Sequence, residues 1–442
     1  MKKLAVILFT SICLGLTAQE MPQGTYSGVL RAGLAKMRLR LNIGADGCSL
    51  DSPDQGATGL PLETDYLGAD SIAVSSKALG AKYNATINGD TLKGKFSQRG
   101  FSFPLTLIKQ EQAIRRPQTP QAPYPYTSTD TVFSNTKGGI TLAGTVVIPQ
   151  GASKDTPVPA IVFVSGSGAQ NRDEELFEHK PFLVIADYLA RHGIASLRYD
   201  DRGFGQSGGD LTTGTTADFA EDALAAVKFL ENFDAISKVG ILGHSEGGTI
   251  AFMAASQYNL PYIVSLAGAI IPCKDILLEQ NRQALAKAHL GVAQTNETLR
   301  LLDAAFDEMA KGNKPEINAL ATKLNINLPQ ALIANLAQNT KSTSPWFCYF
   351  LGLRPLDYVA KTTCPVFAIG GERDTQVNAT KNLEALKNAR PDAETKIYPS
   401  LNHLFQHCTT GETNEYGEIE ETISPEVLDD ITVFITRCTK AR

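Results

Sequence analysis

A serine between glycines is the residue best placed for nucleophilic chemistry. Ser245 lies in the segment Gly243-His-Ser-Glu-Gly-Gly248, which follows the apolar run Val239–Leu242 and precedes the apolar stretch Thr249–Ala255. A strand that turns sharply into a helix exposes such a hydroxyl on a strained turn, and small neighbours let strand and helix pack closely. The helix N-terminus then faces the charge that develops on an attacked carbonyl oxygen. This context predicts an acyl-transfer nucleophile.

The pattern alone is not specific, because Gly205-Gln-Ser-Gly-Gly209 matches it too. That second match follows Arg202-Gly-Phe204 rather than an apolar strand, and no helical run begins after it. We interpret it as a loop near the site. Taken alone, Ser245 could also be an idle serine in a glycine-rich turn, so its partners decide between the two interpretations.

A hydroxyl attacks at neutral pH when an imidazole takes its proton and a carboxylate orients that imidazole. Asp374 comes just after the apolar run Pro365–Gly370, and His403 follows the run Thr395–Tyr398. Carboxyl ends of parallel strands meet at one edge of a sheet, where open α/β sheets build their sites. We therefore predict a triad of Ser245, Asp374 and His403.

Neighbouring residues offer alternatives to this acid and base. Glu372 could replace Asp374, and His407 could replace His403, but both sit less well after their strands. His244 flanks the nucleophile, and we interpret it as a packing or pocket residue rather than as the base.

Acyl transfer also needs two N–H donors that converge on the carbonyl oxygen. The residue after the nucleophile, Glu246, should supply one. The glycine-rich loop Ser165–Gly168 follows the apolar run Ala160–Val164, and we assign the second N–H to Ser167. A glycine-rich loop can also cradle phosphate, but no Gly-Lys-Ser/Thr follows here, which disfavours a nucleotide site.

Residues 127–442 have the sequence pattern of an α/β domain. Apolar strands alternate with helical stretches, which predicts a mostly parallel sheet covered on both faces. The expected strands are Ile140–Ile148, Ala160–Val164, Ile194–Tyr199, Val239–Leu242, Ile263–Ala267, Val366–Gly370 and Thr395–Tyr398. The expected helices are Phe182–Arg191, Thr216–Asn232, Thr249–Gln257, Thr380–Asn388 and Pro425–Arg437. The stretch from about 272 to 358 is helical in period and without strands, so we expect an inserted helical lid.

Substrate contacts are harder to assign. Apolar lid residues such as Trp346 could line an acyl or aromatic pocket, although a lid must also bury a core of its own. Asn171, Arg172 and Asp173 follow the oxyanion loop and could contact a polar substrate end, surface charge being the alternative. His244 is a further pocket candidate.

The N-terminus has the pattern of a secretory signal over residues 1–19: Lys2 and Lys3, an apolar run from Leu4 to Leu16, then small residues before Gln19. We expect export to the periplasm or the medium. The run is too short for a membrane span, so no stable membrane insertion is expected. A lipoprotein acylated at Cys13 is the less favoured alternative.

Residues 20–110 alternate in short runs broken by turn residues, as in Met37–Ile43 and Tyr83–Gly89, which predicts an antiparallel β domain. No catalytic constellation occurs in it, and it could bind substrate or mediate oligomerisation. The proline-rich residues 111–126 predict a stiff linker.

The formal charge of −5 becomes about −7 without the signal, and the chain has no basic cluster, so nucleic acid is an unfavoured partner. No cysteines have metal-ligand spacing, so no metal site is expected. In an oxidising compartment, Cys273 with Cys348 or Cys408 with Cys438 are plausible disulfides.

From Thr127 onward the chain resembles the α/β-hydrolase superfamily, and within it the serine aminopeptidase-like and acyl-esterase branch. The motifs that carry the resemblance are Ser165-Gly-Ser-Gly168, Asn171-Arg-Asp173, Arg198-Tyr-Asp-Asp-Arg-Gly-Phe-Gly-Gln-Ser207, Gly243-His-Ser-Glu-Gly247, Asp374 and His403. The resemblance implies an eight-stranded core, a covalent acyl-enzyme and no cofactor. It also implies that Asp201 and Arg202 are structural. Ser165 stands where a more familiar oxyanion motif has His, which bears on the second N–H donor.

We accordingly expect a serine hydrolase that cleaves small carboxylic esters through a Ser-His-Asp triad. A peptidase on short peptides fits the same residues, and an acidic pocket for the substrate amine would favour it. A thioesterase is less natural outside the cell. A non-catalytic binding protein would have to keep an idle triad.

Overall fold

The computed structural model describes residues 22–32, 35–44, 47–53, 57–98, 100–110, 116–341 and 344–440. The chain divides into two compact units, Met1–Ala113 and Ile114–Arg442. The predicted signal segment, residues 1–19, lies outside the described residues, as do residues 111–115 of the predicted linker. Within the described ranges, no helix combines the length and the apolar character needed to cross a membrane.

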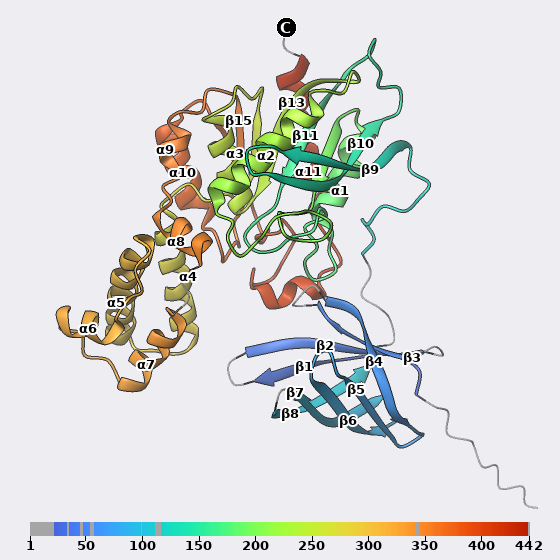
Figure 1. Ribbon diagram of the computed structural model, residues 1–442, viewed down its shortest axis with the longest axis vertical. Helices are drawn as coiled ribbons and strands as arrows, with labels where there is room; N and C mark the ends of the chain where they lie inside the picture. Colours follow the sequence, from blue (N-terminus) through green and yellow to red (C-terminus); the bar gives the residue numbers. More distant parts are fainter. Residues whose placement is uncertain are drawn as a thin grey trace, which may run out of the picture. The chain divides into compact units, whose positions relative to one another are not determined.

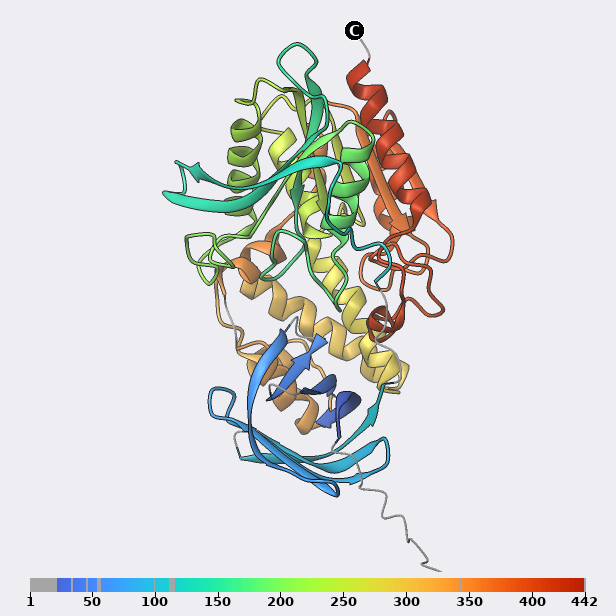
Figure 2. The same cartoon turned by 90° about the vertical axis from the view of Figure 1, so that its right-hand side faces the viewer.

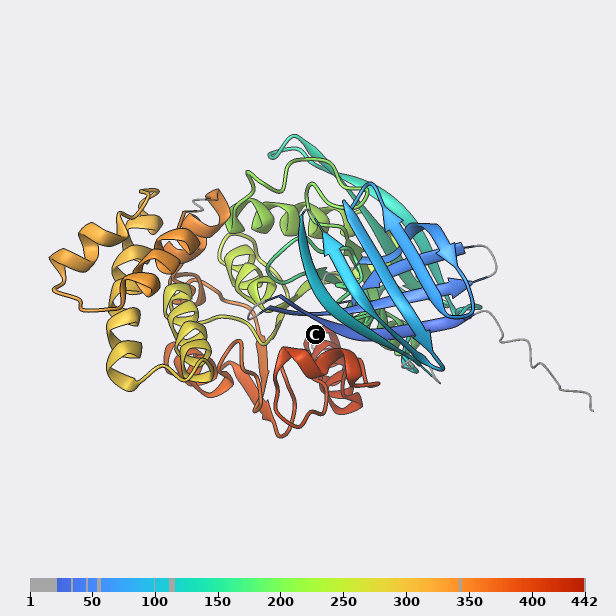
Figure 3. The same cartoon turned by 90° about the horizontal axis from the view of Figure 1, so that it is seen from below.

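The first unit is a closed antiparallel barrel, drawn in blue in Figures 1 and 3. Its strands are β1 Gly24–Ala32, β2 Ala35–Gly44, β3 Gly47–Ser52, β4 Ala57–Leu67, β5 Ser71–Ser76, β6 Ala81–Asn88, β7 Thr91–Gln98 and β8 Phe101–Lys109. Each strand pairs with the next, and β1 closes the ring on β8. The predicted antiparallel β domain is thus confirmed, and closure removes the exposed strand edges that an open sheet would present.

Side chains fill the barrel interior. Burial alternates along the strands, so that Ala81, Tyr83 and Ala85 of β6 point inward while the residues between them are exposed. Leu92 and Leu107 from neighbouring strands are almost fully buried in the same core. The space left inside is about 10 Å³. Among the barrel residues that the structure describes, the interior is therefore a packed core.

The second unit contains an eight-stranded sheet in the order β16-β15-β14-β13-β11-β12-β10-β9. The strands are β9 Tyr126–Asn135, β10 Ile140–Pro149, β11 Val158–Val164, β12 Ala195–Tyr199, β13 Ile236–His244, β14 Ile263–Leu266, β15 Val366–Gly371 and β16 Glu394–Tyr398. Pairings from β12 to β16 are parallel, whereas β10 is antiparallel to both β9 and β12. Strand β9 is not among the strands expected from the sequence, because this edge strand is mostly polar and exposed.

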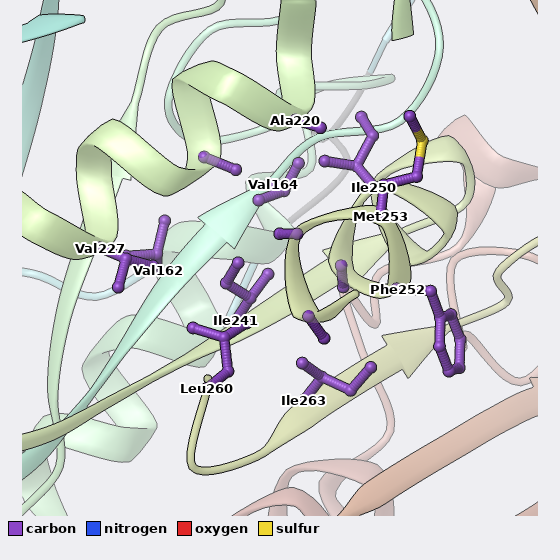
Figure 4. Packing of buried hydrophobic residues seen from close by; sticks show 14 of the residues in the cluster. Val162, Val164, Ala220, Val227, Ile241, Ile250, Phe252, Met253, Leu260 and Ile263 are labelled. Carbon is purple, nitrogen blue, oxygen red and sulfur yellow. The ribbon is translucent and has the colours of Figure 1, made fainter. Parts of the chain in front are cut away.

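Helices cover both faces of this sheet, and alternate strand residues decide which helix they meet. Ile161 and Phe163 of β11 pack with α1 (Pro181–Arg191) and α11 (Pro425–Lys440). Their neighbours Val162 and Val164 pack on the other face, in the cluster shown in Figure 4. The helices of that second face are α2 Thr216–Leu230, α3 Glu246–Ala255 and α10 Ala379–Ala389. Figure 2 shows α11, in red, beside the sheet.

A helical insertion lies between β14 and β15, in yellow and orange in Figure 1. Its helices are α4 Cys273–Lys287, α5 Val292–Ala310, α6 Ile317–Lys323, α7 Gln330–Asn339, α8 Pro345–Gly352 and α9 Leu356–Val359. Most of its apolar side chains, among them Leu301, Phe306 and Met309, form a separate core. The insertion thus holds itself together, and only some of its residues are left to face the site.

The predicted linker stays a prediction. Its described part, residues 116–126, belongs to the second unit, where Arg116 donates to the carbonyl oxygens of Phe177 and Gly417, each at 2.9 Å. The proposed disulfides are wrong, since all six described cysteines are free. Cys408 lies in a loop at the carboxyl ends of the strands, whereas the Cys438 carbonyl contacts Lys238 near the amino end of β13. The sheet therefore separates this pair.

Candidate active site

The nucleophile candidate occupies a strained turn between β13 and α3. Ser245 has φ 54° and ψ −118°, a conformation that L-residues rarely adopt. The nearby glycines leave no space for a side chain. A Cβ on Gly243 would lie 1.9 Å from the carbonyl oxygen of Gly247. A Cβ on Gly247 would lie 2.1 Å from the carbonyl oxygen of Val164. The backbone therefore forms the sharp elbow that the glycine pattern predicts.

The acid and base candidates are joined by a buried hydrogen bond. His403 Nδ1 lies 2.6 Å from Asp374 Oδ2. His403 is 4% exposed and Asp374 is 8% exposed. Asp374 Oδ1 accepts the backbone N–H groups of Gln376 and Val377, which fixes the carboxylate. Because a carboxylate only accepts, Nδ1 carries the ring proton and Nε2 is left as a proton acceptor.

Ser245 and His403 line one cavity of about 510 Å³. The alternative base, His407, does not line it, and the acid bonded to His403 is Asp374 rather than Glu372. Glu372 accepts the N–H of Ser400, and His407 is exposed and pairs with Glu421. The structure thus brings together the residues predicted from strand ends and sets these two apart.

The oxyanion loop after β11 lies against the nucleophile: a Cβ on Gly166 would be 3.1 Å from that of Ser245. The Gly166 N–H already donates to Glu174 at 2.8 Å, so it is not a candidate donor to the oxyanion. Ser167 and Glu246 both line the cavity, and their N–H groups remain our candidates for the oxyanion.

Asp201 braces this loop. It accepts the Ser165 hydroxyl at 2.6 Å and the Gln170 N–H at 2.9 Å. Burial raises the pKa of Asp201 to about 8, against these two hydrogen bonds, which lower it. Ser165, which stands where the familiar motif has His, is therefore a structural residue that anchors the loop to Asp201.

The carboxylate of Glu246 was not predicted to matter, yet it forms part of the cavity wall. It accepts the Thr216 hydroxyl at 2.6 Å and the Trp346 indole N–H at 2.9 and 3.1 Å. Burial raises the pKa of Glu246, although hydrogen bonds from Thr216, Trp346 and Ser167 oppose that rise. Trp346 belongs to α8, so this contact joins the helical insertion to the residue after the nucleophile.

A second unpredicted carboxylate, Glu174, pairs with His244. The Glu174 Oε1 atom lies 2.9 Å from His244 Nδ1, and His244 Nε2 lies 3.0 Å from the carbonyl oxygen of His403. Both residues line the cavity, which agrees with the assignment of His244 as a pocket residue. No local pattern in the sequence distinguishes Glu174 from the other acids of its loop.

Asn171, Arg172 and Asp173 do not line this cavity. The Arg172 guanidinium holds Asp200 at 2.8 and 3.1 Å, and Asp173 pairs with Arg198. The Asn171 side chain accepts backbone N–H groups of its own loop. The polar groups of these three residues are engaged in bracing the loop, and their suggested role as substrate contacts stays a prediction.

The remaining cavity wall is largely apolar. Its apolar members are Leu176, Phe177, Ala269, Ile276, Leu277, Trp346, Phe350, Val377 and Leu404. Its other polar members are Gln170, Gln280, Gln376, Thr413 and Tyr416. Within the described ranges, the lining includes no Lys or Arg, and no group of His, Cys, Asp and Glu side chains is arranged to hold a metal ion.

Comparisons with known proteins place this geometry in a family. A family model described as X-Pro dipeptidyl-peptidase (S15 family) matches residues 138–408. Esterase EstD of Thermotoga maritima is 28% identical over 296 residues, covering 65% of this chain and 64% of EstD. A monoacylglycerol lipase of Mycolicibacterium smegmatis is 25% identical over 265 residues, covering 57% of this chain and 81% of the lipase. This chain thus spans about 64% of the length of EstD.

Solved structures with similarity include Est1E from Butyrivibrio proteoclasticus with bound ferulic acid, at 17% identity and a TM-score of 0.42. The match covers 70% of this chain and 99% of Est1E. The Pyrococcus furiosus esterase Pf2001 is 18% identical with a TM-score of 0.42, covering 74% of this chain and 98% of that protein.

Proposed function

The chain belongs to the X-Pro dipeptidyl-peptidase (S15) family within the α/β-hydrolase superfamily. Within that family, we propose that it is a carboxylesterase that works through an acyl-enzyme at Ser245. The family membership and the esterase relatives make it a hydrolase of the α/β-hydrolase type. The ester substrate and the catalytic triad are our proposal.

In the proposed mechanism, the Ser245 hydroxyl attacks the ester carbonyl while His403 Nε2 takes its proton. Asp374 stabilises the imidazolium, and the N–H groups of Ser167 and Glu246 hold the oxyanion. His403 then gives the proton to the departing alcohol, which leaves an acyl-serine. Water, deprotonated by the same imidazole, releases the acid and restores Ser245.

The observation that carries this proposal is the buried 2.6 Å bond between Asp374 and His403, beside the cavity that Ser245 also lines. Each residue sits where a different strand ends, and the elbow holds Ser245 in a conformation that costs energy. Strain of this kind persists where the surrounding structure enforces it, as it does at functional sites.

Two features favour an uncharged ester over a peptide with a free N-terminus. The cavity carboxylates are already engaged: Glu246 accepts from Thr216 and Trp346, and Glu174 pairs with His244. A substrate ammonium would share these carboxylates with the donors already bound to them. The apolar wall formed in part by Phe350 suits an acyl chain or an aromatic acid.

Peptidase activity is the second candidate, because the family model is described by cleavage after X-Pro. The two are separated by comparing p-nitrophenyl acyl esters with X-Pro p-nitroanilides, at equal enzyme concentration. We expect higher kcat/KM on the esters, with activity lost in Ser245→Ala. Higher kcat/KM on the anilides would replace esterase with peptidase.

We propose that residues 1–19 direct export to the periplasm or the medium, that the α4 to α9 insertion serves as a lid, and that the barrel contacts substrate or another subunit through its outer surface. The mass of the mature N-terminus from an exported fraction checks the first, with Glu20 expected as the first residue.

A further inference from the structure

His244, which stands directly before the nucleophile, has hydrogen-bond partners on both ring nitrogens. Nδ1 faces Glu174 Oε1 at 2.9 Å, and Nε2 faces the carbonyl oxygen of His403 at 3.0 Å. His244 is 5% exposed and Glu174 is 1% exposed, so bulk water does not compete for these contacts. The ring is thus held in one orientation between two different loops.

The partners determine how many protons the ring carries. A carbonyl oxygen only accepts, so Nε2 must be an N–H. Glu174 Oε1 also accepts the Gly166 N–H at 2.8 Å, and as an ionised carboxylate Glu174 can only accept from Nδ1. Nδ1 is therefore an N–H as well. Both bonds can be made at once only by an imidazolium.

The charges around the ring agree with two protons on His244. Burial disfavours a charged His244, but the Glu174 carboxylate, the His403 carbonyl and Asp374 outweigh it and raise the pKa of His244 above its ordinary value. Other titratable groups at the site are His403, whose ring centroid is 4.7 Å away, and Tyr416 and Glu246 on the cavity wall. The flanking strands β11 and β14 place Val164 and Leu266 beside this end of β13.

This pair connects the parts that acyl transfer requires. Through Gly166 it holds the oxyanion loop, whose next residue, Ser167, is our second N–H donor. Through the His403 carbonyl it holds the loop of the general base. We propose that His244 and Glu174 form a buried imidazolium–carboxylate pair that positions the oxyanion loop and the catalytic histidine relative to each other. Both are positioning residues, and their role rests on the proposed function.

Loss of the proton should break the arrangement. A neutral His244 has a single N–H and must leave either Glu174 or the His403 carbonyl without a donor. Activity should therefore fall at alkaline pH as His244 deprotonates. Since the Glu174 charge raises the pKa of His244, Glu174→Gln should lower that pKa and move the alkaline limb of kcat/KM to lower pH, by about one unit or more.

Glu174→Gln is the informative variant because its amide oxygen can still accept from Gly166 and His244. Its matched control is Glu421→Gln, the same change in the exposed His407 pair, which should leave the alkaline limb where it is. An unshifted limb in Glu174→Gln, with wild-type ester turnover intact, overturns the pair while leaving the proposed function in place. Absence of wild-type ester turnover would instead count against the proposed function.

A second measurement does not depend on activity. Nitrogen NMR of the ¹⁵N-histidine-labelled wild-type protein at pH 7 should show protons on both ring nitrogens of one buried histidine. That signal should be missing in His244→Gln, with the remaining histidine signals in place. A neutral, singly protonated ring assigned to His244 would overturn the inference even if the variants fold poorly.

Discussion

The indole N–H of Trp346 donates to both carboxylate oxygens of Glu246, at 2.9 and 3.1 Å. Glu246 is the first residue of α3, and its backbone N–H is our first oxyanion donor. Trp346 lies in the helical insertion and stacks on Phe350, at a ring-centroid distance of 5.4 Å. This one side-chain contact therefore fixes the position of a cavity wall relative to the nucleophile elbow.

Trp346→Phe should weaken the fold and change acyl selection. It leaves the buried Glu246 carboxylate short of a donor, so we expect unfolding free energy to fall by about 1–3 kcal/mol in urea titrations. Thr216→Val removes another donor to the same carboxylate but does not change the cavity wall. Both variants should lose stability, whereas only Trp346→Phe should alter the kcat/KM profile over esters of graded acyl length. Identical profiles in the two variants would remove Trp346 from substrate selection.

Asp374→Asn should preserve the structure and suppress turnover. The amide oxygen can still accept from Gln376 and Val377, but the amide N–H₂ then faces His403 Nδ1 and favours the wrong ring tautomer. We expect kcat on a p-nitrophenyl ester to drop on the order of 10⁴-fold. Glu372→Gln, two positions away, is the matched control and should retain wild-type kcat. A larger loss in Glu372→Gln than in Asp374→Asn would reassign the acid.

Replacing the nucleophile by glycine should stabilise the fold relative to alanine. Ser245 has φ 54°, which costs an alanine as much as a serine but suits glycine. Urea unfolding of Ser245→Gly should therefore give a free energy about 1–3 kcal/mol above that of Ser245→Ala, while both lack activity. Equal stabilities would show that the elbow stores no strain at this position.

Asp201 should make stability depend on pH. Its folded-state pKa of about 8 lies above the unfolded value of 3.8, because burial penalises the charge more than its hydrogen bonds favour it. The native state then keeps a proton that the unfolded chain loses. This contribution is present in full below about pH 4 and is lost as pH rises to about 8, by at most about 1.4 kcal/mol per pH unit.

Asp201→Asn keeps hydrogen-bonding groups for Ser165 and Gln170 and should flatten this dependence in urea titrations between pH 4 and 8. The exposed Asp155→Asn is the control and should follow the wild-type curve. A variant at Asp201 that tracks the wild type across this range would show that folding does not change the pKa of this carboxyl group.

Some of this architecture follows from local pattern and some does not. Ser245, Asp374 and His403 could be predicted because each directly follows an apolar strand, and parallel strands end at one edge. β9 was missed because an edge strand such as Tyr126–Asn135 can remain polar. The barrel strands show their alternation in the sequence, but closure depends on pairing between β1 and β8, which are distant in the chain.

The polar network of the site could not be predicted for a similar reason. Glu174 matters because folding places it beside Gly166 and His244, and nothing in its own segment indicates that contact. Arg172 and Asp173 looked available for substrate because their partners, Asp200 and Arg198, come from the next strand and its end. Sequence spacing shows which residues can do chemistry, whereas burial and pairing show which of them are already engaged.

The central claim is that Ser245 is a nucleophile activated by His403, and a fluorophosphonate probe tests it most directly. Peptide mass mapping of the labelled wild-type protein should place one phosphonyl group on Ser245. Ser245→Ala should not label, and His403→Gln should label far more slowly. Wild-type protein that stays unlabelled, or label that persists in Ser245→Ala, would contradict the account.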